Sequence, residues 1–457
     1  MKPIRFFVKT LGCKVNQVES AFMVETLSKE GFILSEERTA QIFILNSCAV
    51  THKATQESRK LVKRWKKFNP QLIVITGCYA QVYPQEILNW AKKEEIENLV
   101  ILGHKEKFEI AYLLRNFFDL ESENRSFIKI SNPKEFTKFE DLFIEDFFQH
   151  SRAFVKIQDG CNQFCSYCLV PYARGKSRSL PIKQVLKQIE TFIEKGYEEI
   201  LLTGIHLGNW GEDLVPRQKL VELLWQVEKF LSQFKGEFIL RLSSLEVTEI
   251  GEDFLEFAKH SHFLAPHFHI PLQSGSNKIL KLMNRTYTSE FYLRVLEKLY
   301  QLFPQATFGA DVIVGFPEEE EKDFEDTVKV VKNSPLNWLH IFPFSFRPGT
   351  LAEKKWSPKV PSWIVENRKK ILQNLILNKR KAFLESEKGK IRKAVIESLE
   401  NQNLLKGLTE NYIEVKTKTE NPNSNFLIKK VVKIKLLEVK DLYFTGDLIH
   451  TLTKSQP

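Results

Sequence analysis

The stretch Phe154-Val155-Lys156-Ile157-Gln158-Asp159-Gly160-Cys161-Asn162-Gln163-Phe164-Cys165-Ser166-Tyr167-Cys168 decides the fold of the larger part of this chain. It joins a short apolar strand, Phe154–Ile157, to a loop with the spacing C-x3-C-x2-C. Three thiolates on one short loop can hold three irons of a 4Fe-4S cube and leave the fourth iron open, whereas four cysteines close every iron site. An open iron can bind a small molecule, as a catalytic zinc ion keeps one coordination position open.

A zinc site completed by a distant ligand is the alternative use of Cys161, Cys165 and Cys168. The nearest histidine, His150, lies outside the loop and across the strand. The spacing therefore favours the iron–sulfur cluster.

Further apolar runs follow this strand and alternate with amphipathic helical patterns such as Pro181–Lys195. They predict five more strands, at Ile200–Thr203, Phe238–Leu242, His267–Pro271, Phe308–Val314 and Trp338–Phe342. Six β-α units of this kind predict an open or partial β/α barrel within 151–385. Functional sites in such barrels gather at the carboxyl ends of the strands, and the cysteine loop follows the first strand at that edge.

The other three cysteines, Cys13, Cys48 and Cys78, each stand just past a run of apolar residues and before a helical pattern. Such runs are typical of buried parallel strands. With a fourth strand at Leu99–Leu102 they predict a doubly wound α/β domain over 1–115. Since the carboxyl ends of parallel strands share one edge, the three thiols can converge there on a second cluster. Three unrelated core cysteines are the alternative.

Two segments before residue 151 are not assigned to either cluster. The basic run Arg59–Lys67 predicts a helix with a solvated face, or one that touches RNA phosphate. Residues 116–150 are charged and rich in Phe, which indicates a linker packed between domains. Its phenylalanines include Phe136, Phe139, Phe143, Phe147 and Phe148.

The pattern changes after a predicted helix at Trp363–Glu387. Short strands are expected at Ile391–Ile396, Tyr412–Thr417, Val431–Val439 and Leu448–Leu452, with a turn at Asn421-Pro422-Asn423. They predict a small antiparallel β-barrel over 386–457. Its basic residues include Lys429, Lys430, Lys433, Lys435 and Lys440. Basic grooves on such barrels commonly follow a nucleic-acid backbone, and a solubilising surface is the alternative.

Composition sets the limits of these predictions. The 457 residues suffice for about three domains. No apolar stretch is long enough for a membrane span, and the N-terminal residues do not form a secretory signal, so a cytoplasmic protein is expected. The net charge is +10, and the segment from Lys379 onward carries 16 Lys and Arg against 10 Asp and Glu. This concentration of charge favours a nucleic-acid partner.

The cysteine motifs resemble those of the radical S-adenosylmethionine methylthiotransferases. The loop Gly160–Gly175 is similar to the signature of that family, and Thr10–Gln17, Asn46–Thr51 and Thr76–Gln81 are similar to its three N-terminal cysteine motifs. Further matches are Leu202–His206, Arg241–Ser244, Pro271–Ser276 and Gly309–Pro317. The resemblance covers nearly the whole chain in the family's domain order, and the last domain resembles, loosely, the RNA-binding TRAM module.

The family has three main branches, which act on isopentenyladenosine in tRNA, on an aspartate of a ribosomal protein, and on threonylcarbamoyladenosine in tRNA. Lys14-Val15-Asn16 resembles the third branch, and so do Thr203–Gly208 and Gly211–Leu214. The resemblance thus implies methylthiolation of C2 of N6-threonylcarbamoyladenosine at position 37 of tRNA. The other two substrates remain alternatives. An iron–sulfur RNA-binding or electron-transfer protein without radical chemistry is the alternative of a different class.

The resemblance also implies the cofactors and their ligands. S-adenosylmethionine binds the open iron of the cluster on Cys161, Cys165 and Cys168, and an auxiliary 4Fe-4S cluster on the other triplet delivers the sulfur. The implied partners are tRNA and an electron donor of the flavodoxin or ferredoxin type, and the sulfur source stays open. The implied S-adenosylmethionine contacts are Thr203, Gly204, Gln273, Ser274, Val312, Ile313 and Gly315. Arg174, Lys176 and Arg178 are expected either to pair with the substrate phosphate or threonyl carboxylate, or to lie on a solvated loop.

Overall fold

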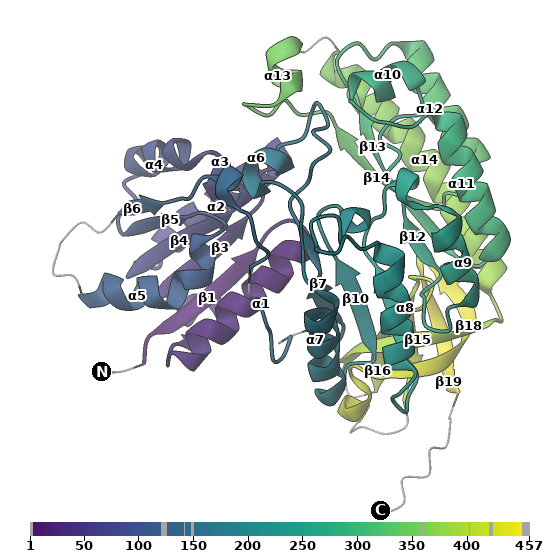
Figure 1. Cartoon of the computed structure of the whole chain (residues 1–457), viewed down its shortest axis with the longest axis horizontal. Coiled ribbons are helices and arrows are strands. Elements are labelled where there is room, and N and C mark those ends of the chain that lie inside the picture. Colours follow the sequence, from purple (N-terminus) through teal and green to yellow (C-terminus); the bar gives the residue numbers. More distant parts are fainter. Residues whose placement is uncertain are drawn as a thin grey trace, which may run out of the picture. The chain divides into compact units, whose positions relative to one another are not determined.

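The computed structural model describes residues 3–119, 126–140, 142–147, 150–357, 360–401, 403–419 and 424–449 (Figure 1). Phe148, the turn Asn421-Pro422-Asn423 and the end of the predicted strand Leu448–Leu452 lie outside these ranges. The chain forms two compact units. The first unit comprises Met1–Glu145, Gln158–Leu180 and Ser345–Lys355, and the second unit comprises Asp146–Ile157, Pro181–Phe344 and Trp356–Pro457. Among the described helices, none is both long and apolar enough to cross a membrane.

A six-stranded parallel sheet in the order β2-β1-β3-β4-β5-β6 forms the centre of the first unit (Figure 1). Its strands are β1 (Arg5–Thr10), β2 (Ile33–Leu34), β3 (Ile42–Ser47), β4 (Leu72–Gly77), β5 (Leu99–Leu102) and β6 (Phe127–Lys129). Its main helices are α1 (Lys14–Lys29), α2 (His52–Lys66), α3 (Cys78–Val82), α4 (Pro84–Lys93) and α5 (Ile110–Asp119). The predicted doubly wound sheet is confirmed. The edge strands β2 and β6 were not predicted, and β6 comes from the segment assigned to the linker.

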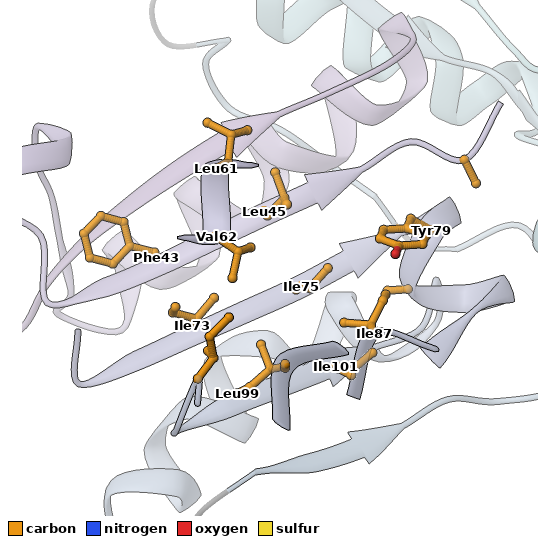
Figure 2. Packing of buried hydrophobic residues seen from close by; sticks show 14 of the residues in the cluster. Phe43, Leu45, Leu61, Val62, Ile73, Ile75, Tyr79, Ile87, Leu99 and Ile101 are labelled. Atoms are coloured by element: carbon orange, nitrogen blue, oxygen red, sulfur yellow. The ribbon is translucent and has the colours of Figure 1, made fainter. Parts of the chain in front are cut away.

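The alternation of side chains explains why this sheet needs helices on both faces. Phe43 and Leu45 of β3 join the hydrophobic cluster on one face, together with Val62 of α2 (Figure 2). Ile42 and Ile44 of the same strand join the cluster on the other face. All six residues of β3 and of β4 are buried. Each fully buried Val, Leu or Ile side chain contributes roughly 1.5–3 kcal/mol. The sheet is therefore a rigid base for the loops at its edge.

The second unit contains the predicted partial β/α barrel. Its strands are β7 (Ala153–Lys156), β10 (Glu199–Thr203), β11 (Ile239–Leu242), β12 (His267–His269), β13 (Thr307–Val314) and β14 (Trp338–Pro343). They form two parallel sheets, β11-β10-β7 and β12-β13-β14. Leu240 connects the sheets, since its N–H donates to the Phe263 carbonyl at 2.7 Å and its carbonyl accepts from Ala265 at 2.8 Å. All six predicted strands are present.

The last part of the second unit is a closed five-stranded barrel in the order β15-β16-β17-β19-β18, reached through helix α14 (Ser362–Glu387). Its strands are β15 (Ile391–Glu400), β16 (Leu404–Thr409), β17 (Glu414–Lys418), β18 (Val431–Lys440) and β19 (Tyr443–Ile449). Strand β16 was missed in the sequence. The pairs are antiparallel except β17 with β19, which run parallel.

The turn between β16 and β17 lies against the amino ends of the partial-barrel strands. Arg241 of β11 donates to the carbonyls of Thr409 (3.2 Å) and Glu410 (2.9 Å), and it pairs with Glu199 of β10 at 2.8 Å. Tyr412 stacks on His267 with ring centroids 4.1 Å apart. Within the second unit this turn covers the amino ends of the strands, opposite the edge where ligands gather in such folds.

Candidate active site

Cys13, Cys48 and Cys78 follow three neighbouring strands of the first unit, β1, β3 and β4. The strands are in register, since Asn46 pairs with Thr10 on one side and with Thr76 on the other. The strand order reverses between β1 and β3, where ligands collect in open parallel sheets. Gly12 lies so close to Cys48 that an added Cβ would stand 3.1 Å from its Sγ. The three thiols therefore share one edge.

The electrostatics of this edge suit a metal ligand set. Cys13 is exposed, whereas Cys48 and Cys78 are buried. Burial, together with the charges of the neighbouring Cys78 and Cys13, raises the pKa of Cys48 to about 12. Burial also raises the pKa of Cys78, which the Arg174 guanidinium opposes. Because a metal binds the thiolate form of cysteine, a metal ion that binds at this edge would displace the thiol protons.

The second triplet lies on a loop whose ends close on each other within the first unit. Strand β8 (Gln158–Asp159) pairs with β9 (Arg178–Ser179), and the Cys161 N–H donates to the Gly175 carbonyl at 3.1 Å. The N–H groups of Gln163 and Val170 donate to the sulfurs of Cys161 and Cys168, each at 3.4 Å. Hydrogen bonds of this kind to cysteine sulfurs tune iron–sulfur clusters.

The donor set of each triplet is three cysteine thiols, and cysteine thiolates are the usual protein ligands of iron–sulfur clusters. All six cysteines are free thiols. Within the described parts of the chain, no three His, Cys, Asp or Glu side chains are grouped as ligands of one metal ion.

The structure contradicts both expectations for Arg174 and Arg178. Arg174 is 1% exposed and Arg178 is 3% exposed, so neither lies on a solvated loop or presents its guanidinium to a substrate. Arg174 lies between the carboxylates of Glu19 and Asp159, both at 2.9 Å. Burial alone would lower the pKa of Arg174, but these carboxylates raise it well above its ordinary value. Of the three cations, only Lys176 is exposed.

The residues expected to contact S-adenosylmethionine lie at three strand ends of the second unit. Thr203 ends β10, and Gly204 follows it. Gln273 pairs with Val312 of β13 in an isolated bridge, and its carbonyl accepts from the Ile313 N–H at 2.9 Å. The structure thus brings Gln273, Val312 and Ile313 together.

The side chains of this set differ in what they can offer. Val312 is fully buried, and the Ser274 hydroxyl lies 3.4 Å from that of Thr327. Gly315 adopts φ 77°, and an added Cβ there would stand 2.5 Å from Val365. Ile313 is only partly buried. These positions leave mainly backbone groups and Ile313 for a ligand.

A polar cluster in the partial barrel was missed in the sequence. Along β13, Asp311 and Ile313 are partly exposed while Val312 and Val314 are buried, so Asp311 belongs to the face that the covering helices do not bury. His269 contacts Asp311 at 3.1 Å, and its ring centroid lies 5.4 Å from that of His340. The usable signal was the position of Asp311 inside the motif Gly309–Pro317.

Most basic residues singled out in the sequence pair within their own unit. In α2, Lys63 pairs with Glu94 at 2.7 Å, and Arg59 and Arg64 pair with Glu86 and Glu37. On the β-barrel, ion pairs join Lys429 to Asp146 (3.3 Å), Lys430 to Glu198 (3.1 Å) and Lys433 to Glu237 (3.6 Å). Lys435 and Lys440 of β18 are exposed.

Two cysteine triplets on parallel α/β folds, one of them spaced C-x3-C-x2-C, define an iron–sulfur protein of the radical S-adenosylmethionine class. Family models agree: "Radical SAM superfamily" matches residues 155–331, and "Uncharacterized protein family UPF0004" matches residues 5–100. The chain is 38% identical over 410 residues to the threonylcarbamoyladenosine tRNA methylthiotransferase MtaB of Aquifex aeolicus, which covers 89% of this chain and 95% of that protein. The chain therefore belongs to the radical S-adenosylmethionine methylthiotransferase family, whose members use S-adenosylmethionine and 4Fe-4S chemistry.

Two other similarities place the chain within a wider group. It is 33% identical over 464 residues to the tRNA-2-methylthio-N(6)-dimethylallyladenosine synthase of Clostridium botulinum, covering 97% of each chain. Among solved structures, the radical S-adenosylmethionine methyltransferase TsrM from Kitasatospora setae aligns with a TM-score of 0.55 at 13% identity, covering 77% of each chain. At that identity the likeness concerns the fold alone.

Proposed function

We propose that this chain methylthiolates C2 of N6-threonylcarbamoyladenosine at position 37 of tRNA. The observation that carries the proposal is the 38% identity to a threonylcarbamoyladenosine tRNA methylthiotransferase over nearly the full length of both chains. The sequence Lys14-Val15-Asn16 after Cys13 supports the same branch. The functional domains are 1–115 for the auxiliary cluster, 116–150 as a connection, 151–385 for the radical core, and 386–457 for RNA binding.

The six cysteines hold two 4Fe-4S clusters in this proposal, one on each triplet. When bound, the clusters and S-adenosylmethionine supply a 5′-deoxyadenosyl radical and a sulfur atom, chemistry that no side chain can perform. The protein holds the ligands and orients the substrate. The N–H groups of Gln163 and Val170 stabilise the Cys161 and Cys168 thiolates, and the charge of Arg174 favours the Cys78 thiolate.

S-adenosylmethionine is held by the seven residues at the strand ends of the second unit. Thr203 and Gly204 serve the methionine end, and Ile313 and Gly315 serve the adenine. The burial of Val312 and the contact of Ser274 with Thr327 leave these two residues their backbone groups for binding. Gln273, at φ 62°, forms the turn before Ser274 and places its own backbone beside Val312.

Partners follow from the same chemistry. The tRNA contacts the face of the β-barrel that includes Lys435 and Lys440, because these lysines are exposed. A donor of the flavodoxin or ferredoxin type supplies electrons to the clusters. A cytoplasmic location agrees with a tRNA substrate.

Nucleoside mass spectrometry tests the proposal. Anaerobically reconstituted protein, S-adenosylmethionine and reductant are incubated with tRNA that carries threonylcarbamoyladenosine. A new methylthio-threonylcarbamoyladenosine peak is expected. Deoxyadenosine without that peak would overturn the substrate assignment and favour isopentenyladenosine, in line with the 33% identical dimethylallyladenosine synthase, or else the ribosomal protein. No deoxyadenosine at all would overturn the radical mechanism.

A further inference from the structure

The cysteine loop of the radical core packs into the core of the N-terminal sheet. The short helix α6 (Val170–Arg174) directly follows Cys168 and contacts α3, which begins at Cys78. Leu169 and Ala173, 5% and 1% exposed, belong to the same hydrophobic cluster as Cys78 and Tyr79. All of these residues lie in the first unit. Both cysteine triplets are thus parts of one packed body.

Arg174, at the end of α6, is the polar centre of this packing. One guanidinium nitrogen donates to Glu19 and to Asp159, each at 2.9 Å, and the other donates to the Asn16 Oδ1 at 2.6 Å. Glu19 and Asn16 are buried residues of α1, the helix that follows Cys13. Lys107 donates to Glu19 from the other side. A guanidinium offers several donors in one rigid plane, which suits a site with three acceptors.

The partners of Arg174 lead directly to the cysteine loops. Asn16 donates its amide to the carbonyls of Leu11 (2.8 Å) and Ser47 (3.2 Å), which lie two residues before Cys13 and one residue before Cys48. Asp159 accepts from the Gly160 N–H at 2.8 Å, immediately before Cys161. One guanidinium therefore connects the backbone at cysteines of both triplets.

We infer that Arg174 is a positioning residue that fixes the spacing between the two cysteine triplets. This inference rests on the proposed function, because it gives the triplets two clusters that must act on one substrate atom. Arg174 touches neither the substrate nor the reacting atoms. Its role is to hold the sulfur-donating triplet and the radical-generating triplet in one geometry, and reactions of this kind lose rate steeply when their partners are misplaced.

The test compares sulfur insertion with radical formation in the reconstituted holoenzyme. Arg174→Lys keeps the charge but cannot bond Glu19, Asp159 and Asn16 in one plane. Methylthiolated nucleoside formed per deoxyadenosine should fall by about 10- to 100-fold, the loss expected of a misplacement near 1 Å. Glu19→Gln, a milder change of the same network, should lower the ratio in the same direction. A ratio equal to that of the unsubstituted protein would overturn the inference.

Arg241→Lys is the matched control. Arg241 is equally buried, but it lies in the second unit, where it pairs with the buried Glu199 at the amino end of β10. The variant Arg241→Lys should lower the melting temperature without changing the amount of methylthiolated nucleoside formed per deoxyadenosine. If both products of Arg174→Lys fell only in proportion to bound iron, the role of Arg174 would be merely structural and the inference would be wrong.

A measurement on the chain without clusters separates this inference from the proposed function. Hydrogen exchange of the amides in 158–180 and 11–16 should accelerate in Arg174→Lys, because the network holds both segments. Unchanged exchange would overturn the inference. Absence of methylthiolated product from the unsubstituted enzyme would instead contradict the proposed function, and the exchange result would still decide the role of Arg174.

Discussion

Two buried arginines at opposite strand edges illustrate how the chain uses one interaction for two purposes. Arg174 in the first unit and Arg241 in the second are both among the largest fully buried side chains, and each pairs with a buried carboxylate. Arg174 lies at the carboxyl edge of its sheet, where it connects cysteine loops. Arg241, the third residue of β11, reaches Glu199 at the amino end of β10 and binds the carbonyls of Thr409 and Glu410.

The difference teaches that the place of a buried ion pair in the fold, rather than its strength, decides what it does. Residues at the amino ends of parallel strands serve stability, and residues at the carboxyl ends serve function. The Arg241 network joins the β16–β17 turn to the partial barrel of the second unit. The Arg174 network joins pieces that must keep a fixed distance during a reaction.

The largest expected effects are at the cysteines themselves. Cys165→Ala removes one of three ligands at the cluster that generates the radical, so deoxyadenosine formation should be abolished. Cys48→Ala removes a ligand of the sulfur-donating cluster, so radical formation should persist while methylthiolation stops. Both products are measured on the same anaerobic samples. Methylthiolation that survives Cys48→Ala would contradict the sulfur-donor role.

The iron content of the reconstituted protein checks the same assignment. Two 4Fe-4S clusters require about eight irons per chain, and each cysteine variant should lose about half of them. About four irons in the unsubstituted chain would contradict the two-cluster proposal. Such a result would also remove the basis for a positioning role of Arg174.

The next effect concerns stability at the other end of the strands. Arg241→Met removes the partner at 2.8 Å from Glu199, which is fully buried, and leaves Arg152 at 3.8 Å as the remaining cation among the described residues. Removing one partner of a buried ion pair typically costs about 3–5 kcal/mol. We expect a loss of this size in the free energy of unfolding, measured by anaerobic urea denaturation. If the loss were below about 1 kcal/mol, the interaction would resemble a surface ion pair.

Much of the fold and the cysteine site could be predicted because their signals are local. Apolar runs of five or six residues fixed the strands before Cys13, Cys48 and Cys78, and the topology of parallel sheets then placed the thiols at one edge. The spacing C-x3-C-x2-C likewise lies within one loop. Neither prediction required knowledge of distant contacts.

The features that were missed have weak local signals or partners far along the chain. Arg174 looks like an exposed cation in the sequence, and its burial depends on Glu19 and Asn16, more than 150 residues away, as well as on the nearby Asp159. Strand β6 has three residues and pairs only with β5. Strand β16, Leu404–Thr409, pairs with its sequence neighbours β15 and β17, but Lys406 and Gly407 interrupt its apolar pattern. The distant partners of Arg174, by contrast, leave no periodic pattern in the sequence.

A pH dependence should arise beside the Arg174 network, where His104 lies 2.8 Å from Lys107. Burial, with the charges of Lys107 and Arg174, lowers the pKa of His104 well below its usual range. The unfolded chain therefore binds a proton below pH about 6.5 that the folded chain does not bind, so stability is lost as the pH falls below that value. The loss should be roughly 1.4 kcal/mol per pH unit.

The variant His104→Gln removes this contribution. Relative to the unsubstituted protein, its unfolding free energy should fall less between pH 6.5 and pH 5.5, by about 1 kcal/mol, because an unfolded histidine is already half protonated at pH 6.5. The comparison of two proteins cancels effects of acid on the clusters. His260→Gln, at an exposed side chain of α9 (Glu252–His260), is the control. Equal pH slopes for His104→Gln and the unsubstituted chain would contradict the buried, neutral state of His104.

The smallest effect should come from lysines of the β-barrel, which lies in the second unit together with Arg241. Here the comparison is between lysines that pair with carboxylates and lysines that are exposed. Lys430 and Lys433 pair with Glu198 and Glu237 of the same unit, whereas Lys435 and Lys440 are exposed. If the exposed pair binds phosphate, Lys435→Gln with Lys440→Gln should weaken tRNA binding a few-fold and reduce the salt slope by about 2, one for each lysine replaced. Lys430→Gln with Lys433→Gln should change the slope less, because these charges already have carboxylate partners. Fluorescence anisotropy over a range of salt concentrations measures both variants. A larger change in the second would place the RNA nearer to Lys430 and Lys433 than to Lys435 and Lys440.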